Sequence, residues 1–260
     1  MSSEYWKERM AKSQTALTDK SVKQIEAQLR KYYSTAMKKT IADFEATYNK
    51  LLTTMEEGKQ PTPADLYKLD KYWEAQAQLR HELNKLGERE ITALSKVFER
   101  NYFEIYYSIG LQGEAAFNTI NTEMVEQLIN GIWVADGKSF SQRVWDNTER
   151  LVSTLNDELV NCVVAGKPSS YLKTALMERF SVSYNRADAL ARTELAHIQT
   201  EAAKKRYEDY GIAEVEIWAD EDERRCDECG KLHQKRYPVG AAVPIPAHPR
   251  CRCCVIPVVE

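Results

Sequence analysis

The chain has 260 residues, of which 43 % are apolar and 29 % are charged, so we expect one or two folded domains rather than a disordered protein. No apolar run approaches the ~20 residues that cross a bilayer, and the N-terminus lacks the apolar core of a signal peptide, which predicts an intracellular protein without a membrane partner. The net charge of −3 gives no overall attraction to nucleic acid, and an exposed helix face explains the local positive excess in residues 1–50 as well as DNA contact would.

Apolar residues at steps of three and four predict a long helix near the start of the chain. The stripe runs from Val22 to Met55. Ser21 and Gln24 have the spacing of a capping box, so we expect the helix to begin there.

Residues 61–63 interrupt the pattern with two prolines, and Thr62 is suited to cap a second helix that ends near Gly110. A third helical segment is expected between Glu114 and Val134. The stripes of these segments predict an antiparallel bundle or a long hairpin, which buries them within the chain or against a partner.

The second half of the chain also begins with helices. Ser139 or Ser141 is expected to cap a helix that stops before Pro168. Two further helices are expected over residues 169–180 and 183–210.

The periodicity then changes from that of a helix to that of a strand. Residues 213–219 alternate, which predicts a short strand with Val215 and Ile217 on one face. Residues 253–259 are its expected partner, and Pro257 confines that partner to an edge of the sheet. The predicted fold class is therefore mainly α, with long N-terminal helices and a small β cap at the C-terminus.

Close to the C-terminus, soft metal ligands follow the pattern C-x2-C-x18-H-x2-C-x-C-C. Its members are Cys226, Cys229, His248, Cys251, Cys253 and Cys254. Paired ligands two residues apart, with a second pair further on, are typical of a four-coordinate structural zinc site. The first four residues are the expected ligands. Cys253 competes with Cys251, because alternate residues of an extended segment point the same way, and Cys254 faces the other side.

Other readings of this cluster stay open. Six cysteines can form disulfides, although an intracellular protein disfavours them, and the thiols can also be unpaired. His233 is a minor alternative to His248. A catalytic metal is less favoured, because the surplus thiolates leave no open coordination position. Several arginines flank the cysteines and are expected to lower the thiol pKa values rather than to bind DNA phosphates, because acidic residues crowd the same region: Arg224, Arg225, Arg250 and Arg252.

Four segments, taken in order, resemble the minor head proteins of tailed bacteriophages, the Mu F-like head-morphogenesis family. They are Ser-Phe-Ser-Gln-Arg-Val-Trp at 139–145, Ala-Arg-Thr-Glu at 191–194, the Trp218–Cys229 segment and the His248–Cys253 segment. The resemblance covers roughly residues 130–257. It implies a helical, partner-docking region over residues 1–130 and a Mu F-like domain over residues 131–260 with its Cys/His module at 226–254.

What the resemblance implies is a non-enzymatic minor structural protein of the virion head, present in the host cytoplasm during assembly. Its expected partners are the portal protein and capsid or scaffold proteins, with an effect on DNA packaging or ejection. Two alternatives from other classes are a zinc module that binds double-stranded DNA and a metal-dependent hydrolase or nuclease.

Three residues within these segments are expected to have structural or interaction roles: Arg192, Glu194 and Trp218. Arg192 and Glu194 are two residues apart, so their side chains should diverge on a helix. One of them is expected to contact the loop that follows Trp218. Family members commonly have a glycine after Leu232, where this chain has His233 and Gln234. His81 and His197 stand alone on predicted helices and are expected to be ordinary surface or core residues.

Overall fold

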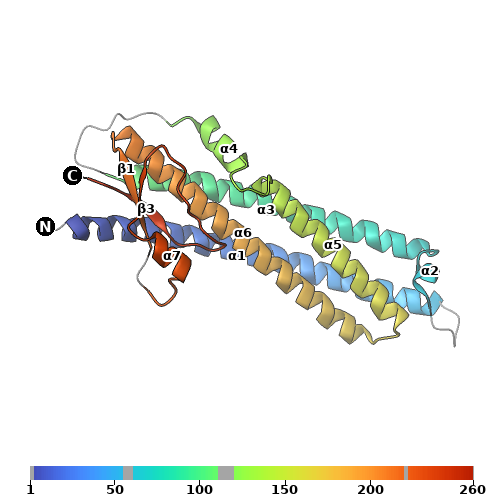
Figure 1. Ribbon diagram of the computed structural model, residues 1–260. Coiled ribbons are helices and arrows are strands. Elements are labelled where there is room, and N and C mark those ends of the chain that lie inside the picture. Colours follow the sequence, from blue (N-terminus) through green and yellow to red (C-terminus); the bar gives the residue numbers. More distant parts are fainter. Residues whose placement is uncertain (1–2, 55–60, 111–119, 220–221, 260) are drawn as a thin grey trace. The chain divides into compact units, whose positions relative to one another are not determined.

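A computed structural model describes residues 3–54, 61–110, 120–219 and 222–259 of the chain (Figure 1). Its helices are α1 (Ser3–Thr54), α2 (Pro63–Leu66), α3 (Asp70–Ser108), α4 (Thr122–Asn130), α5 (Phe140–Val164), α6 (Ser169–Asp209) and α7 (Asp227–Leu232). Its strands are β1 (Glu214–Trp218), β2 (Arg236–Pro238) and β3 (Cys254–Pro257). The predicted fold class is confirmed. Within the described ranges, no helix has both the length and the apolar character of a segment that crosses a bilayer.

The first helix begins earlier than predicted. α1 starts at Ser3 instead of after Ser21, so the predicted capping box is wrong. Ser21 is buried inside the helix, where its Oγ accepts a hydrogen bond from Asn101 Nδ2 at 3.2 Å. The buried positions of the first turns include Ala11 and Gln14, which are small or polar and therefore leave no apolar stripe in the sequence.

The predicted second helix is divided in two. Thr62 caps α2 as expected, and Asp65 completes a capping box in which its carboxylate accepts from the Thr62 N–H at 3.1 Å. Hydrogen bonds from Thr62 lower the pKa of Asp65 to about 2. α2 nevertheless ends at Leu66, and α3 begins only at Asp70.

The later helices agree with the prediction only in part. α4 covers part of the segment expected over residues 114–134, of which residues 114–119 lie outside the described part of the chain. α5 begins directly after Ser139. The two helices predicted over residues 169–210 form one continuous helix, α6, so the predicted break near residue 182 is wrong.

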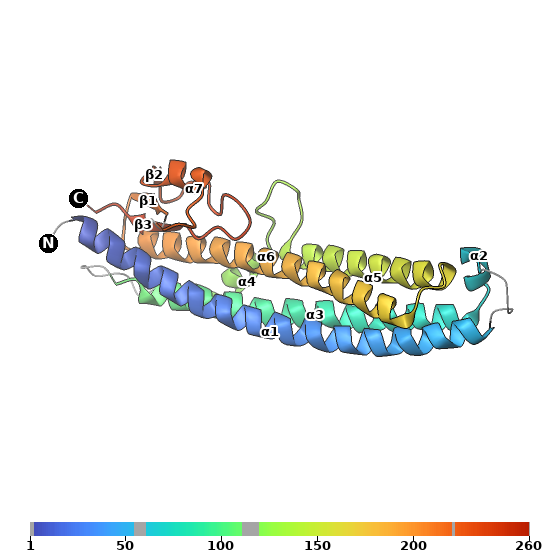
Figure 2. The same ribbon diagram turned by 90° about the horizontal axis from the view of Figure 1, so that it is seen from below.

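The chain forms two compact units, each of which combines segments from before and after residue 130. We call Ala27–Ala93 with Ser141–Ala187 the helical unit, and Met1–Glu26 with Leu94–Phe140 and Asp188–Glu260 the cap unit. Within the helical unit, segments of α1, α3, α5 and α6 run alongside one another (Figure 2). The apolar side chains of these segments form its core, as in other helix bundles.

A polar network lies inside the helical unit and joins its four long helices. Tyr33 Oη of α1 donates to Glu90 Oε2 of α3 at 3.1 Å. Asn147 Nδ2 of α5 donates to Tyr33 Oη and to the Ser183 carbonyl oxygen of α6, each at 3.1 Å. The Glu90 residue is only 1 % exposed, and burial raises its pKa to about 7, because a low-dielectric environment disfavours the charged carboxylate.

Gly87 allows α3 and α5 to approach closely in the same unit. A Cβ atom at this position would lie 2.9 Å from a ring carbon of Trp145 and 3.1 Å from Thr148 Oγ1. The Trp145 side chain therefore occupies the space that a larger residue at position 87 would need.

A three-stranded antiparallel sheet in the order β2-β1-β3 forms part of the cap unit. Val215 and Ile217 are fully buried, as the alternation predicts, and Pro257 lies in the edge strand β3 opposite Val215. Glu216 between them is also buried, where its carboxylate accepts two 2.9 Å hydrogen bonds from Lys7 Nζ. The sequence did not predict β2, which has only three residues and no apolar alternation.

The sheet packs on the N-terminal part of α1 and the C-terminal part of α6. Gln14 Nε2 donates to Tyr207 Oη at 2.9 Å and to the Val255 carbonyl oxygen at 3.1 Å. Ala11 packs with Cys254 and Ile256 of β3 in an apolar cluster. Residues far apart in the sequence thus form the support of the cap.

Candidate metal centre

The first pair of donors is positioned by the short helix α7. Cys226 is its N-cap residue, and the Cys226 Sγ accepts a hydrogen bond from the Cys229 N–H at 3.4 Å. This capping geometry directs both side chains toward the same point, which explains why two residues separate the paired ligands.

The second group of donors lies on the segment between β2 and β3. His248 begins a four-residue turn that is closed by a 3.1 Å hydrogen bond from the Cys251 N–H to the His248 carbonyl oxygen. Cys251 and Cys253 follow, and both are buried.

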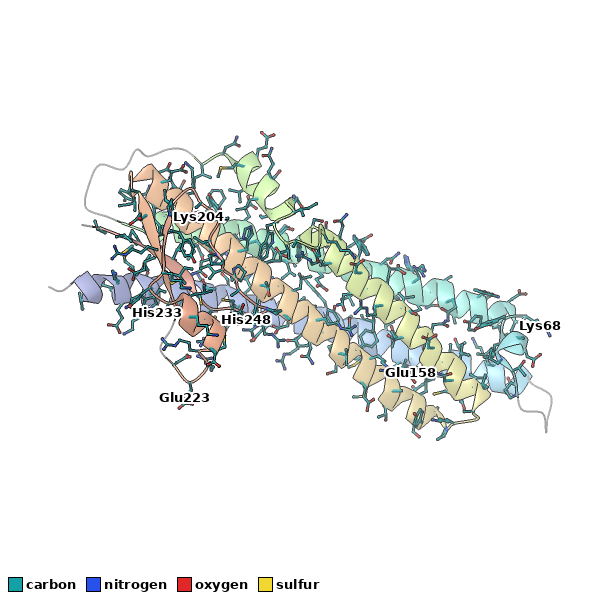
Figure 3. The ribbon with its side chains drawn as sticks, in the orientation of Figure 1. Lys68, Glu158, Lys204, Glu223, His233 and His248 are labelled. Carbon is teal, nitrogen blue, oxygen red and sulfur yellow. The ribbon has the colours of Figure 1, made fainter. Side chains whose placement is uncertain are left out.

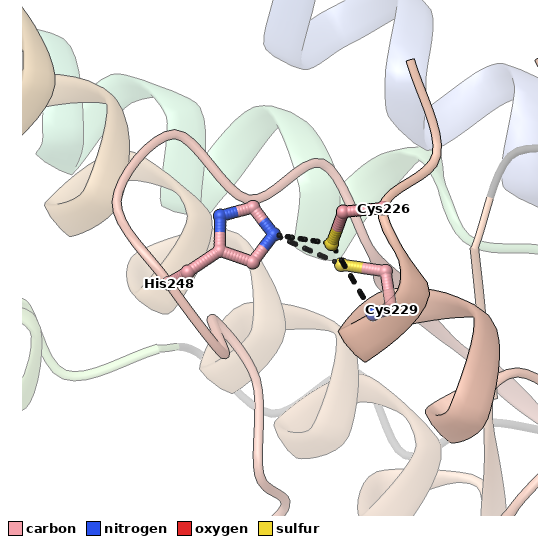
Figure 4. Close-up of side chains that lie close together, drawn as sticks. All are labelled: Cys226, Cys229 and His248. Carbon is pink, nitrogen blue, oxygen red and sulfur yellow. Dashed lines mark hydrogen bonds between the residues drawn. The ribbon is translucent and has the colours of Figure 1, made fainter. Parts of the chain in front are cut away.

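The donors from the two segments converge (Figure 4). His248 Nε2 lies 3.2 Å from Cys226 Sγ and 3.1 Å from Cys229 Sγ, and the Sγ atoms of Cys229 and Cys251 are 3.8 Å apart. Zinc–ligand distances of about 2.0–2.3 Å in a tetrahedron place neighbouring ligand atoms roughly 3.5–3.8 Å apart. These separations are therefore close to those of a four-coordinate zinc site.

All five candidate donors form two overlapping groups. Cys226, Cys229 and His248 form one group and Cys229, Cys251 and Cys253 the other, and the ligand atoms of each group lie within 4.8 Å of one another. Cys229 belongs to both groups. The cluster thus offers one donor more than a tetrahedral ion needs.

The imidazole of His248 is oriented by its own backbone neighbour. His248 Nδ1 donates to the Pro249 carbonyl oxygen at 2.9 Å, and this bond raises the pKa of His248. In the neutral ring, a proton on Nδ1 leaves the Nε2 lone pair directed at the cysteines, which is the usual arrangement of a histidine that binds a metal.

The pKa values of the thiols diverge within the cluster. Hydrogen bonds from Cys253 lower the pKa of Cys251 to about 5, and the same contact raises the pKa of Cys253. Burial raises the pKa of Cys229 to about 12, whereas the Cys229 N–H lowers the pKa of Cys226. Hydrogen bonds and burial are the leading causes of these shifts, rather than the arginine charges that the sequence suggested.

The remaining cysteine and histidine candidates lie away from the two donor groups. Cys254 belongs to β3 and packs with Ala11 and Ile256, so it faces away from Cys253 as the alternation predicts. His233 lies on the same C-terminal segment as His248 (Figure 3), but its Nδ1 accepts the Ala219 N–H at 3.1 Å and it belongs to neither donor group.

The other two histidines are helix residues, as expected. His81 is exposed on α3, whereas His197 is buried on α6. The His197 ring stacks on Trp133 with centroids 4.2 Å apart, and burial lowers its pKa to about 4.

Arg192 and Glu194 diverge on α6. Arg192 Nε donates to Asp188 at 3.0 Å, and its guanidinium also pairs with Glu26 of α1. Glu194 is buried and accepts a 2.8 Å hydrogen bond from Trp133 Nε1. These three partners lie outside the loop over residues 218–225, in which a partner for one of the two side chains was expected.

Trp218 is the last residue of β1 and belongs to neither donor group. Its ring meets that of His233 edge to face, with centroids 4.9 Å apart, and it also packs against the apolar cluster of Ala11, Cys254 and Ile256.

Two arginines that flank the cysteines instead tie the cap segments together. Arg252 forms two hydrogen bonds with Asp222 at 2.6 and 2.8 Å, and this pairing holds the pKa of that carboxylate well below its usual range. Arg250 donates to Asp188 Oδ2 of α6 at 2.8 Å. Sequence reasoning did not identify these carboxylate partners, because neither pair has a spacing that marks it.

Comparison with known proteins places this centre in a family domain. Residues 153–256 match the family model described as Phage Mu protein F like protein, and the match includes α6, β1, β2 and all five clustered donors. No curated protein and no solved structure gives a significant match. The resemblance seen in the sequence is confirmed over residues 153–256, which are similar to the Mu F-like proteins of phage head morphogenesis.

Proposed function

We propose that this chain is a minor structural protein of a tailed-phage head that binds the portal and capsid or scaffold subunits during prohead assembly. The family match carries the proposal, because the family is one of structural head-morphogenesis proteins. The protein would assemble in the host cytoplasm and remain in the virion, where it affects DNA packaging or ejection.

We further propose that Cys226, Cys229, His248 and Cys251 hold a structural zinc ion. Their separations and the orientation of His248 support this set. Cys253 then remains a thiol that donates a hydrogen bond to Cys251, in keeping with the opposite shifts of their pKa values. The bound ion would supply a cross-link between α7 and the segment before β3.

The segment between β2 and β3 buries little apolar surface. Among residues 239–250, all of which are described, only Ile245 is buried. A segment that buries so little apolar surface gains stability from a metal in place of a core.

The observations favour this structural role over the two alternatives. A surplus thiol beside four ligands leaves little room for the open position that a hydrolytic zinc requires. Arg250 and Arg252, two of the arginines that adjoin the cysteines in sequence, are engaged with Asp188 and Asp222, which disfavours a role for them in binding DNA phosphates.

Co-sedimentation of the purified chain with recombinant portal tests the assembly function, with capsid and scaffold proteins in parallel mixtures. Retention by at least one head component is expected. The absence of binding to all of them, together with a normal yield of infectious heads after gene deletion, would reject the proposal. Retardation of duplex DNA at low salt would instead favour the DNA-binding alternative.

Metal content is a separate measurement on the same protein. Elemental analysis is expected to give one zinc per chain for the wild type and a clear loss for Cys226→Ser. A wild-type protein purified without added chelator that contains no stoichiometric zinc contradicts the metal site but leaves the assembly function open.

A further inference from the structure

The turn that carries two of the proposed ligands contains a non-glycine residue in the left-handed backbone conformation. Pro249 and Arg250 occupy the centre of the turn from His248 to Cys251, and Arg250 has a φ of +63°. Proline suits the second position of a type II turn, whereas the third position favours glycine or asparagine, because a Cβ atom disfavours the left-handed region. A glycine at position 250 would form this turn with less strain, so the arginine side chain must provide something that glycine does not.

Two hydrogen bonds from Arg250 hold the turn against α6. The Arg250 N–H donates to Thr193 Oγ1 at 3.1 Å, and its guanidinium donates to Asp188 Oδ2 at 2.8 Å. Thr193 Oγ1 donates its own proton to the Ala189 carbonyl oxygen at 2.7 Å. Its lone pairs can therefore accept the hydrogen bond from the Arg250 N–H. The backbone and the side chain of a single residue thus contact α6 at two points.

The carboxylate in this arrangement is itself fixed. Asp188 accepts from Arg192 Nε at 3.0 and 3.1 Å, and its side chain is only 9 % exposed. Asp188 and Thr193 lie about one and a half turns apart on α6. A rigid helix therefore presents both partners of Arg250, and no movement of the loop is needed to reach them.

We propose that Arg250 is a positioning residue of the metal centre: bonded to Asp188 and Thr193, it holds the His248–Cys251 turn in the conformation that binds the ion. This inference rests on the zinc site of the proposed function. It makes the helix α6 a part of that site, although α6 supplies no ligand. Partners that orient metal ligands in this way commonly contribute 10- to 100-fold to metal affinity.

Zinc affinity, measured by competition with a chromophoric chelator, tests the proposal in four variants. Arg250→Gly keeps the turn accessible but removes the guanidinium, Asp188→Asn keeps the shape of the acceptor, and Thr193→Val removes only the hydroxyl. Each is expected to weaken zinc binding, with a loss of about 10- to 100-fold for Arg250→Gly and Asp188→Asn. Arg250→Lys, which keeps the charge and the backbone bond, should recover part of that loss.

Arg252→Ala is the matched control, because Arg252 also pairs with a carboxylate of the cap but lies outside the turn. It is expected to bind zinc within about threefold of the wild type, which is small beside the 10- to 100-fold range. Cobalt substitution adds a readout that general destabilisation does not move. The absorption bands of a tetrahedral cobalt–thiolate centre should weaken or shift in Arg250→Gly while the far-UV circular dichroism of the apoprotein stays unchanged.

The outcomes separate the two proposals. Wild-type affinity and cobalt spectra in both Arg250→Gly and Asp188→Asn would overturn the positioning role and leave the zinc site standing. A wild-type chain that binds neither metal would overturn the zinc site and this inference with it. An equal loss of affinity in Arg252→Ala would also overturn the positioning role, since it would show a nonspecific effect of removing cap charges.

Discussion

The substitution Glu90→Gln is expected to stabilise the protein at neutral and alkaline pH but not at acid pH. Glu90 is buried among four helices of the helical unit, with Tyr33 Oη as its hydrogen-bond donor, and its Oε1 has no partner among the described residues. Glutamine has nearly the same shape and remains neutral. The substitution therefore removes the cost of a buried charge and little else.

The magnitude follows from the pKa of Glu90, which burial raises from 4.5 to about 7. Below pH 4.5 the carboxyl is protonated in the folded and the unfolded chain, so the residue contributes no pH dependence there. As the pH rises toward 7, the unfolded chain loses this proton while the folded chain retains it, and the free energy of unfolding falls. A difference of about 2.5 pKa units corresponds to about 3 kcal/mol of unfolding free energy, at about 1.4 kcal/mol per unit. The wild type has lost this contribution once the pH is above 7.

Urea unfolding of wild type and Glu90→Gln at pH values from 4.5 to 8 tests this reasoning. The difference between their free energies of unfolding should grow from near zero at pH 4.5 to about 3 kcal/mol at pH 8. Glu88→Gln is the matched control, because Glu88 is exposed on the same helix, and its curve should parallel that of the wild type. A difference that is constant over this pH range, or that shrinks as the pH rises, would refute a buried carboxyl that keeps its proton.

Three further predictions concern the turns, the helix packing and the metal. Gln234 has a φ of +62°, so Gln234→Gly should stabilise the cap by about 1 kcal/mol in chemical denaturation whereas Gln234→Ala should give no gain. Gly87→Ala brings a methyl group against Trp145, and a net loss of about 1–2 kcal/mol in unfolding free energy is expected even though alanine favours the helix. Chelator treatment should lower the melting temperature of the wild type and of Cys253→Ser. It should leave the melting temperature of Cys251→Ser, which lacks a proposed ligand, nearly unchanged. Equal responses of the two variants would contradict the ligand set.

The helices were predictable where their buried residues are apolar and not elsewhere. The stripe from Val22 onward identified most of α1, but the turns before it bury Ala11, Gln14 and Ser21, which carry no apolar signal. The predicted break near residue 182 has a related cause. Ser181 and Ser183 interrupt the apolar pattern of α6, yet Ser183 is buried and its carbonyl oxygen accepts from Asn147, so tertiary packing maintains the helix there.

The clustering of the candidate metal ligands was predictable from the sequence, but the contacts that support them were not. Spacing alone indicated the five donors, because pairs two residues apart have few other uses. The contacts of Arg250 with Asp188 and Thr193 join residues about 60 positions apart, and no local pattern marks such pairs. The turn after Leu232 was also not predictable from the residue type. A glycine is common there in the family, but in this chain Gln234 adopts the left-handed conformation that the turn needs.

The contact of the first helix with the last strand has a consequence for how the protein can be made and divided. Gln14 bonds to the Val255 carbonyl oxygen, Lys7 neutralises the buried Glu216, and Ala11 covers Ile256. During synthesis on the ribosome, these contacts of the N-terminal turns of α1 can therefore form only after more than two hundred further residues have been made. A fragment cut to the limits of the family match would lose this cover, and the strand that follows the proposed metal ligands would expose apolar surface to solvent.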